Sequence, residues 1–538
     1  MKIVIVGGVA GGMSAATRLR RLSEDAEITV VERSGYVSFA NCGLPYHVGG
    51  VIEERSALLL QTPESLAARF GIRVLVRHEV TAIDRAGRVV TVSGPDGEVD
   101  MPYDALVLSP GARPVRPPIP GIERALSLRD IEDTDAMVAA VSGDVRTAVV
   151  IGGGFIGVEV AENLRHKGMD VTIVEAADQV MAPLDPEMAA FVHERIRDHG
   201  VDLRLGAGVE AIGERDVTLA DGSVVPADVV VASIGVRPDS SLAADAGLEV
   251  EERGGIVVDE AMRTSDPAIY AVGDAVVKRD ALDGSAVMVP LANTANRQGR
   301  MVADVIMGRD AGDRPVLGTA IVGIFGLQVA TTGWNAKRLA AAGREFRQIH
   351  THPVSHAGYY PGAAGLHLKL LVDPETDAIL GAQALGEEGA DKRVDVIATA
   401  MAGGITASRL ADLELAYAPA FGSAKDPVNM LGYVASNLRE GTVETVQWDE
   451  VAERVAAGDV LLDTRTPGEV ARGAIPGALN IPVDDLRERL DEVPEGRVVA
   501  YCAVGIRGYL AARILSQAGR EVANLDGGYT TWRAATAG

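Results

Sequence analysis

The chain has 538 residues, of which 47% are hydrophobic and 23% charged, and its formal net charge at pH 7 is −24. This length is too great for one hydrophobic core, so several domains are expected, and the apolar content argues against disorder. The acidic balance argues against nucleic acid or an anionic membrane as a partner, and no apolar run has the length of a membrane span. We therefore expect a cytoplasmic protein that acts on small molecules and holds any polyanionic ligand with a local basic cluster.

The first residues are typical of a nucleotide-binding βαβ unit. A strand over 2–6 leads into the turn GGVAGG at 7–12, a helix over 13–22 and a strand over 27–32. Backbone N–H groups of such a turn bind a pyrophosphate, and a carboxylate about 20 residues further on binds a ribose. Val9 stands at the middle glycine position, and the alternative for Glu32 is an ordinary strand-end charge. The predicted contacts are Gly7, Gly8, Val9, Ala10, Gly11, Gly12 and Glu32.

The same pattern starts again at residue 148, after the proline-rich segment 114–121. A strand over 148–151, the turn GGGFIG at 152–157, a helix over 158–167 and a strand over 170–175 repeat the first unit, which predicts two dinucleotide sites. No Arg or Lys between Glu175 and Pro183 could receive a 2′-phosphate, which favours NADH, with NADPH as the alternative. The predicted contacts are Gly152, Gly154, Ile156, Gly157 and Glu175.

Two cysteines occur in the chain, each in a loop that contains glycine. Cys42 lies in SFANCGLP at 38–45, and Cys502 lies in YCAVGIRG at 501–508. Because neither has a second cysteine nearby, the sequence predicts no local disulfide and no metal site. A lone thiol is either a buried apolar residue or a reaction site, and two such loops favour chemistry that passes sulfur between molecules.

Four motifs together resemble the pyridine nucleotide–disulfide oxidoreductase family. They are the two glycine turns in this order, LSPGARP at 108–114 and TSDPAIYAVGD at 264–274. The resemblance covers about residues 1–437 and implies FAD at the first turn and a nicotinamide coenzyme at the second. It also places Ser109, Gly111 and Asp274 at the flavin, with Asp274 on the ribityl chain.

Around Cys42 the chain resembles the single-cysteine branch of that family, because His47 stands where dithiol members carry a second cysteine. That branch includes coenzyme A–disulfide reductases, NADH oxidases and peroxidases, and persulfide reductases. The partner of the thiol is then a substrate sulfur, in a mixed disulfide, or an oxygen, in a sulfenic acid. The positions that match coenzyme A contacts are Ser14, Arg18, Arg21, Ser38, Asn41, Asn296 and Lys425. Asn296 replaces a histidine of another member, and the alternative for Ser14, Arg18 and Arg21 is a solvated helix face.

Three tyrosines follow in the later region: Tyr359 and Tyr360 in HAGYYPG at 356–362, and Tyr417. The resemblance implies that Tyr417 and one of the pair reach the partner subunit's flavin and thiol site in a homodimer. There they could donate a proton to a departing thiolate. The alternative is that all three are buried at a domain junction.

The C-terminal segment resembles a rhodanese domain. The resemblance rests on DTRTPGE at 463–469, GAIPGALNIP at 473–482, the Cys502 loop and NLDGGYTTW at 524–532. A loop from Cys502 to Arg507 that leads into a helix can surround an anionic sulfur with N–H groups and a guanidinium, which stabilises a persulfide. The resemblance also implies that Asp463 and Glu469 orient arginines. The alternative is an inactive rhodanese fold kept for docking.

The predicted fold class is α/β, with two Rossmann-like dinucleotide-binding domains, an α+β dimerisation domain and a C-terminal α/β rhodanese domain. The predicted boundaries are 1–113 and 238–314 for FAD, 114–237 for NAD(H), 315–437 for dimerisation and 446–538 for rhodanese.

The predicted function is an FAD-dependent reductase of persulfides or polysulfides that uses NADH and also reduces coenzyme A disulfide. Cys42 would form the mixed disulfide, and Cys502 would carry sulfane sulfur. One alternative is an NADH oxidase or peroxidase that cycles through a sulfenic acid at Cys42. Another is a sulfur-relay protein whose flavin part senses redox state.

Overall fold

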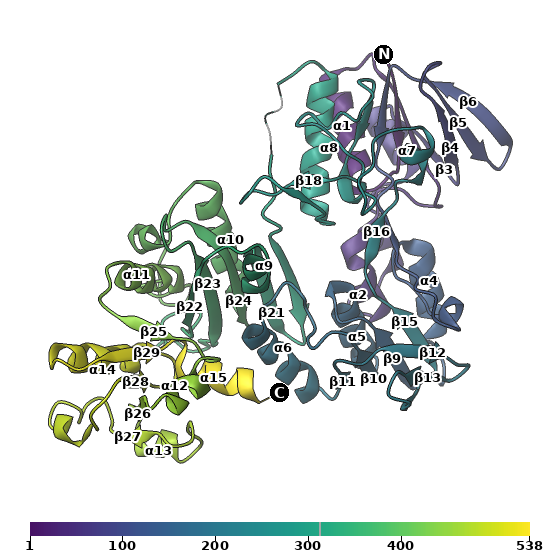
Figure 1. Ribbon diagram of the computed structural model, residues 1–538. Coiled ribbons are helices and arrows are strands. Elements are labelled where there is room, and N and C mark those ends of the chain that lie inside the picture. Colours follow the sequence, from purple (N-terminus) through teal and green to yellow (C-terminus); the bar gives the residue numbers. More distant parts are fainter. Residues whose placement is uncertain (311, 313, 538) are drawn as a thin grey trace. The chain divides into compact units, whose positions relative to one another are not determined.

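The computed structural model describes residues 1–310, 312 and 314–537, which form two compact units (Figure 1). The first unit comprises residues 1–180 and 200–318, and the second comprises 181–199 and 319–538. Residues 181–199 group with the second unit, although the predicted NAD(H)-binding range includes them. Residues 311 and 313 of the predicted FAD-binding range and residue 538 of the predicted rhodanese range lie outside the described residues.

The first unit is built on two parallel sheets with the order expected of nucleotide-binding folds. The first follows the order β17-β7-β1-β2-β3, and the second follows β11-β10-β9-β15. The strands are β1 (Lys2–Val6), β2 (Glu27–Glu32), β3 (Arg73–Val76), β7 (Ala105–Leu108), β17 (Ile269–Ala271), β9 (Thr147–Ile151), β10 (Asp170–Val174), β11 (Asp202–Arg204) and β15 (Val229–Ala232).

Helices α1 (Ala10–Leu22) and α8 (Ala292–Ile306) pack side by side against the first sheet (Figure 1). They approach closely because Gly299 meets the backbone of Gly11: a Cβ at Gly299 would lie 2.2 Å from the Gly11 carbonyl oxygen. In the second sheet, α5 (Phe155–His166) packs against β9 and β10.

Both helices after the glycine turns begin three residues earlier than predicted: α1 at residue 10 instead of 13, and α5 at 155 instead of 158. Glycine is a poor helix former, which by itself favours a turn at these positions. Here a close approach outweighs propensity, because a Cβ at Gly12 would lie 2.0 Å from the Gly7 carbonyl oxygen. Glycine is therefore the residue that fits inside this first helical turn.

The remaining elements of the first unit are short. Two are antiparallel three-stranded sheets, two are strand pairs, and the rest are helices. They are β4 (Glu79–Asp84), β5 (Val89–Gly94) and β6 (Gly97–Pro102); β12 (Val209–Ile212), β13 (Asp216–Leu219) and β14 (Val224–Pro226); β8 (Ala112–Pro114) with β16 (Val236–Pro238); β18 (Lys278–Arg279) with β19 (Ala286–Val287); and α2 (Leu44–Val48), α3 (Pro63–Phe70), α4 (Ile131–Ala140) and α7 (Ser241–Asp245).

The second unit contains an antiparallel sheet of order β20-β21-β24-β23-β22. Its central strands are buried, and α10 and α11 share their core. The elements are β20 (Ala320–Ile324), β21 (Leu327–Gly333), β22 (Arg347–Thr351), β23 (Leu366–Val372), β24 (Ile379–Gly386), α6 (Pro186–Asp198), α9 (Ala336–Ala341), α10 (Ala390–Ala402) and α11 (Pro427–Arg439).

A second sheet of this unit is parallel and has the order β25-β29-β28-β26-β27, with an apolar cluster on each face. Its elements are β25 (Glu444–Val446), β26 (Val460–Asp463), β27 (Leu479–Asn480), β28 (Val498–Tyr501), β29 (Val522–Leu525), α12 (Val451–Ala456), α13 (Pro467–Val470), α14 (Ile506–Gln517) and α15 (Gly528–Thr536). The predicted α/β class is confirmed. Within the described residues we find no helix with the length and apolar character that crossing a membrane requires.

Candidate active sites

The two glycine turns repeat one contact at the level of atoms. The Gly8 amide donates a hydrogen bond to Glu32 Oε2 over 2.7 Å, and the Gly153 amide donates to Glu175 Oε2 over the same distance. Glu32 is 8% exposed, so it is not an ordinary strand-end charge in solvent. Each carboxylate is fixed beside its turn, where the ribose of a dinucleotide would lie.

Steric constraints at the second turn match the requirements of a bound pyrophosphate. A Cβ at Gly157 would lie 2.0 Å from the Gly152 carbonyl oxygen, as at the first turn. By contrast, a Cβ at Gly154 would meet no atom within 4 Å. The middle glycine therefore borders open space, which is what a backbone that must approach a pyrophosphate needs. The residues present fit FAD at the first turn and a nicotinamide coenzyme at the second.

The predicted flavin contacts Ser109 and Asp274 lie near the first turn. A Cβ at Gly7 would lie 2.1 Å from the Ser109 carbonyl oxygen, and Gly7 has a φ of +96°. Asp274 forms an ion pair with Arg129 at 3.1 Å. Lys278 donates to the Gly273 carbonyl oxygen over 2.7 Å, and its burial lowers the pKa of its ammonium to about 8 despite the nearby Asp274. The predicted contact Gly111 has a φ of +74°, which only glycine adopts readily.

Cys42 lies in a short 3₁₀ turn at Asn41–Gly43, directly before α2, and is exposed. Partial enclosure of its sulfur raises the pKa of the thiol, the carboxylates of Glu159 and Asp274 raise it further, and Arg129 lowers it. Ser38, a predicted coenzyme A contact, has a φ of +51°. Left-handed backbone at a residue other than glycine is strained, and such strain is concentrated at functional sites.

Sequence reasoning missed Tyr46 and Glu159 beside this thiol. The Tyr46 hydroxyl donates a hydrogen bond to Glu159 Oε1 over 3.0 Å, and α2 packs against α5, which carries Glu159. Burial raises the pKa of Glu159 to about 7, and the Tyr46 hydrogen bond opposes that rise. The available signal was a carboxylate one turn into an otherwise apolar helix start, FIGVE.

The predicted coenzyme A contacts of the first unit are partly brought together. Ser14 donates a hydrogen bond to Asn296 Oδ1 over 2.6 Å, which joins α1 to α8. Arg18 forms an ion pair with Asp304 at 2.7 Å, so a phosphate at Arg18 would have to compete with that carboxylate. Arg21 is exposed on the same helix. Asn41 lies next to Cys42 in the chain and is half-buried.

The tyrosines and Lys425 belong to the second unit. Tyr359 and Tyr417 hydrogen bond to each other through their hydroxyl oxygens over 2.9 Å, and this bond raises the pKa of Tyr417. Tyr359 is 77% exposed, Tyr360 45% and Tyr417 46%, and Lys425 is exposed as well. The alternative of tyrosines buried at a junction is therefore wrong for this chain. Their assignment to a partner's site stays a prediction.

Cys502 is fully buried at the carboxyl end of β28, where α14 begins. The Gly505 amide donates to Cys502 Sγ over 3.2 Å. Arg507, on the first turn of α14, is held by Glu469 through two hydrogen bonds of 2.8 and 2.5 Å. This contact lowers the pKa of Glu469 to about 2, so the pair stays charged. An amide and a fixed guanidinium beside the sulfur are suited to an anionic persulfide.

The second predicted carboxylate, Asp463, likewise orients an arginine, Arg465, through a buried ion pair of 2.6 Å. The Arg465 guanidinium carbon lies 4.2 Å from the centre of the Tyr529 ring. The backbone amide of Tyr529 in turn donates a hydrogen bond to the Cys502 carbonyl oxygen.

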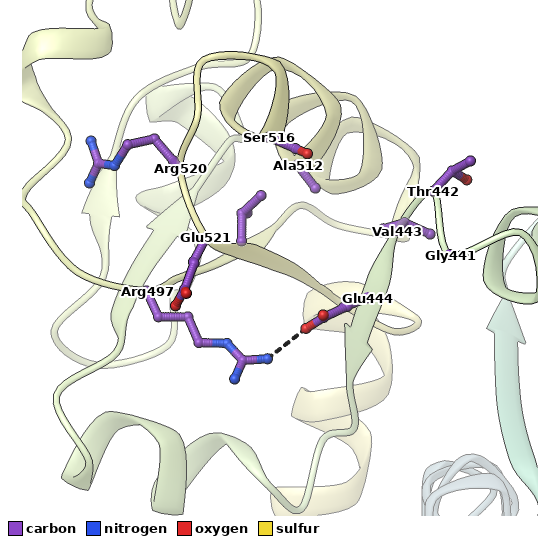
Figure 2. A pocket seen from close by; sticks show the side chains of 10 residues that line it. Gly441, Thr442, Val443, Glu444, Arg497, Ala512, Ser516, Arg520 and Glu521 are labelled. Atoms are coloured by element: carbon purple, nitrogen blue, oxygen red, sulfur yellow. Dashed lines mark hydrogen bonds and ion pairs between the residues drawn. The ribbon is translucent and has the colours of Figure 1, made fainter.

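A cavity of about 300 Å³ lies at the amino ends of the strands of this sheet, opposite the end that carries Cys502. It is lined by residues at or just before the amino ends of β25, β28 and β29 and by Ala512 and Ser516 of α14. Cys502 follows the carboxyl end of β28, so the length of the parallel strands separates the two. Figure 2 shows Arg497 turned toward Glu444, to which it is bound at 2.8 Å. Arg520 donates to the carbonyl oxygens of Val493 and Pro494. Both arginines are thus engaged, and the cavity plays no part in the sulfur site.

Two dinucleotide-type folds beside a lone thiol, together with a cysteine loop arranged for an anion, define an oxidoreductase with a sulfur-carrying module. The chain belongs to the pyridine nucleotide-disulphide oxidoreductase family, whose model matches residues 1–299. The dimerisation domain of that family matches residues 319–427, and a rhodanese-like domain matches 447–535. The resemblance drawn from the motifs is confirmed.

Two solved structures align with nearly all of the chain, and a curated relative aligns with most of it. The crystal structure of reduced Bacillus anthracis CoADR-RHD is 49% identical, with a TM-score of 0.98 over 99% of this chain and 98% of that chain. A NAD-dependent persulfide reductase from A. fulgidus is 39% identical, with a TM-score of 0.94 over 99% of this chain and 100% of that one. Coenzyme A disulfide reductase of Staphylococcus aureus is 35% identical over 440 residues, 81% of this chain and 99% of the relative.

Proposed function

We propose that the chain reduces coenzyme A persulfide or polysulfides to sulfide with electrons from NADH, and that it also reduces coenzyme A disulfide. The observation that carries the proposal is the pairing of two unlike thiols. Cys42 is exposed and has no cysteine partner, whereas Cys502 is buried against an amide beside Arg507. The named activities of the relatives point the same way.

At Cys42 the substrate supplies the second sulfur. The Cys42 thiolate attacks the coenzyme A sulfur of the persulfide, which gives Cys42–S–S–coenzyme A and releases HS⁻. Two electrons and one proton then convert the mixed disulfide into the Cys42 thiolate and coenzyme A thiol. When bound at the two glycine turns, FAD and NADH supply those electrons. Glu159, whose pKa lies near 7, is close enough to influence the charge of the thiol.

At Cys502 sulfur is transferred without net redox change. The Cys502 thiolate takes the outer sulfur of thiosulfate, which leaves as sulfite, and becomes a persulfide. Coenzyme A thiol then accepts that sulfur, which regenerates the Cys502 thiol and yields the coenzyme A persulfide that Cys42 consumes. The Gly505 amide and Arg507 stabilise the anionic sulfur between these steps.

We extend the proposal to a homodimer in which Tyr417 and either Tyr359 or Tyr360 act at the partner's Cys42 site. The exposure of these tyrosines supports this, because exposed aromatic side chains can contact a second chain. The coenzyme A contacts would be the seven predicted residues, with Arg18 released from Asp304 on binding. A reducing compartment such as the cytoplasm suits both free thiols.

The test uses the full-length protein with Cys42→Ser and Cys502→Ser variants. Cys42→Ser should abolish NADH-dependent sulfide release and disulfide reduction. Cys502→Ser should keep disulfide reduction and lose sulfur transfer from thiosulfate. Mass spectrometry without reductant should find coenzyme A on Cys42 and an added sulfur on Cys502. Full sulfide release by Cys42→Ser would overturn the proposal, and oxygen-dependent NADH turnover with no thiol substrate would favour the oxidase alternative.

A further inference from the structure

A buried histidine of the second unit lies between two carboxylates. His350, on β22, approaches Asp526 with Nδ1 at 2.6 Å and Glu187 with Nε2 at 3.1 Å. Its backbone amide also donates to both Asp526 oxygens, over 3.0 and 3.1 Å. His350 and Asp526 are each 3% exposed and Glu187 is 2% exposed. The three residues come from β22, the end of β29 and α6, so the contact joins the antiparallel sheet to the rhodanese-like domain.

Both ring nitrogens of His350 face carboxylate oxygens, an arrangement that favours a proton on each nitrogen. The surroundings agree: although burial opposes the charge, Asp526 and Glu187 raise the pKa of His350 to about 9. Lys369, on β23, is a second cation of the cluster and binds Glu187 and Asp185, the latter at 2.8 Å. His352, directly after β22, and Lys337, on α9, are further titratable groups beside this cluster.

With His350 protonated, the cluster holds three carboxylates and two cations, all at most 3% exposed. Loss of the His350 proton would leave Asp526 and Glu187 facing a neutral ring in a site with little water. The Asp526 carboxylate would keep its hydrogen bonds from the His350 backbone amide and the Gln447 side chain but lose its buried countercharge. Loss of a countercharge in a buried site is unfavourable and favours a displacement of the carboxylate.

Asp526 directly precedes the backbone that supports the Cys502 loop. Gly527 and Gly528 follow it with φ values of +66° and +61°, and a Cβ at Gly528 would lie 2.5 Å from the Cys502 carbonyl oxygen. The Tyr529 amide then donates to that oxygen over 2.8 Å. A displacement of Asp526 would therefore reach the Cys502 carbonyl group through the backbone of Gly527 and Gly528.

We infer that His350 and Asp526 are positioning residues for sulfur transfer at Cys502: their ion pair, anchored by Glu187, fixes the 526–529 backbone on which the Cys502 loop rests. The inference rests on the proposed sulfur transfer at Cys502. It assigns a role in that reaction to a histidine that lies outside the rhodanese-like domain. Cys42 belongs to the first unit, whereas His350 and Asp526 belong to the second, so we expect the reductase half to be little affected by this pair.

The first test is Asp526→Asn in the full-length protein, because asparagine keeps the shape and removes the charge. Sulfur transfer from thiosulfate to cyanide should fall by about 10- to 100-fold, as expected for a small displacement of a reacting group. NADH-dependent reduction of coenzyme A disulfide should stay within about twofold of the unchanged chain. The matched control is Glu444→Gln, which removes the carboxylate of the Arg497 ion pair at the amino ends of the strands of the same sheet. This control should leave both activities unchanged.

The second test uses pH to change the charge of His350 without a mutation. In the unchanged protein, sulfur transfer should decline as the pH rises through about 9, where His350 loses its proton. In Asp526→Asn the decline should move to lower pH, because His350 has lost one of the carboxylates that hold its proton. The unchanged protein needs no mutation for this measurement, so a poorly folded variant does not end the test.

Two results would overturn the inference: wild-type sulfur transfer with an unshifted pH profile in Asp526→Asn, or an equal loss of both activities in a folded variant. Failure of the proposed function looks different, because Cys502→Ser would then transfer sulfur as well as the unchanged chain.

Discussion

Tyr46, four residues after Cys42 in the chain, donates a hydrogen bond from its hydroxyl group to the Glu159 carboxylate over 3.0 Å. Glu159 has a pKa of about 7 because it is buried, and its charge is the largest contribution after burial to the raised pKa of Cys42. Thiol, hydroxyl and carboxylate therefore form one protonation system. The electron-accepting thiol is coupled to a group that changes charge near neutral pH.

Glu159→Gln should make Cys42 more reactive. Removing the carboxylate removes a charge that disfavours the thiolate, so the pKa of Cys42 should fall and more thiolate should be present at pH 7. In a Cys502→Ser background, alkylation of Cys42 by iodoacetamide at pH 7 should speed up by about two- to fivefold. The control is Asp170→Asn, a carboxylate on the same fold whose side chain is 85% exposed. Unchanged or slower alkylation of Glu159→Gln would contradict the coupling.

The local chemistry of the chain could be predicted from sequence because it depends on neighbouring residues. A glycine turn, the carboxylate about 20 residues later and a cysteine loop before a helix each act over one βα unit. The Gly8–Glu32 and Gly153–Glu175 contacts are therefore where the motifs place them. The helix starts were missed because propensity alone does not report a 2.0 Å approach between Gly12 and Gly7.

Contacts between distant segments could not be predicted. Tyr46 and Glu159 are 113 residues apart, and His350 and Asp526 are 176 apart. In the sequence, nothing distinguishes any of these four residues from an ordinary polar position. Only the packing of α2 on α5, and of β22 on the end of β29, brings these residues together and shifts the pKa values of Glu159 and His350.

Gly154→Ala should separate coenzyme binding from folding. A Cβ at this position meets no atom within 4 Å, and its φ of −78° suits any residue, so the variant should fold with a near-normal melting temperature. If the pyrophosphate of NADH lies there, the methyl group should raise the KM for NADH by roughly tenfold while FAD stays bound, which its absorbance reports. Gly157→Ala is the contrasting variant, since its Cβ would lie 2.0 Å from a carbonyl oxygen and should destabilise the fold. An unchanged KM in Gly154→Ala would contradict the assignment of the second turn.

Glu469→Gln should weaken sulfur transfer without touching Cys502. Glu469 fixes Arg507 through two hydrogen bonds, so its loss should leave the guanidinium charged but free to rotate. We expect kcat for transfer from thiosulfate to fall by about tenfold, and Arg507→Ala to lose about a hundredfold. Arg489 and Glu492 form a comparable exposed pair in the same domain, and Glu492→Gln is the matched control. Equal rates for Glu469→Gln and Glu492→Gln would show that Arg507 needs no fixed orientation.

The stability of the second unit should have a maximum near pH 6.5. The pKa of His350 is raised to about 9, so its contribution, about 3 kcal/mol, is complete below its ordinary value of 6.5 and is lost as the pH rises through 9. Burial lowers the pKa of His193 and of His367 to about 4, so their contribution is complete above 6.5 and is lost as the pH falls through 4. The three tryptophans of the chain, Trp334, Trp448 and Trp532, all lie in this unit, so their fluorescence reports its melting selectively. His350→Gln should flatten the alkaline branch and leave the acid branch in place. A melting temperature that rises between pH 6.5 and 9 in the unchanged protein would refute the charged state of His350.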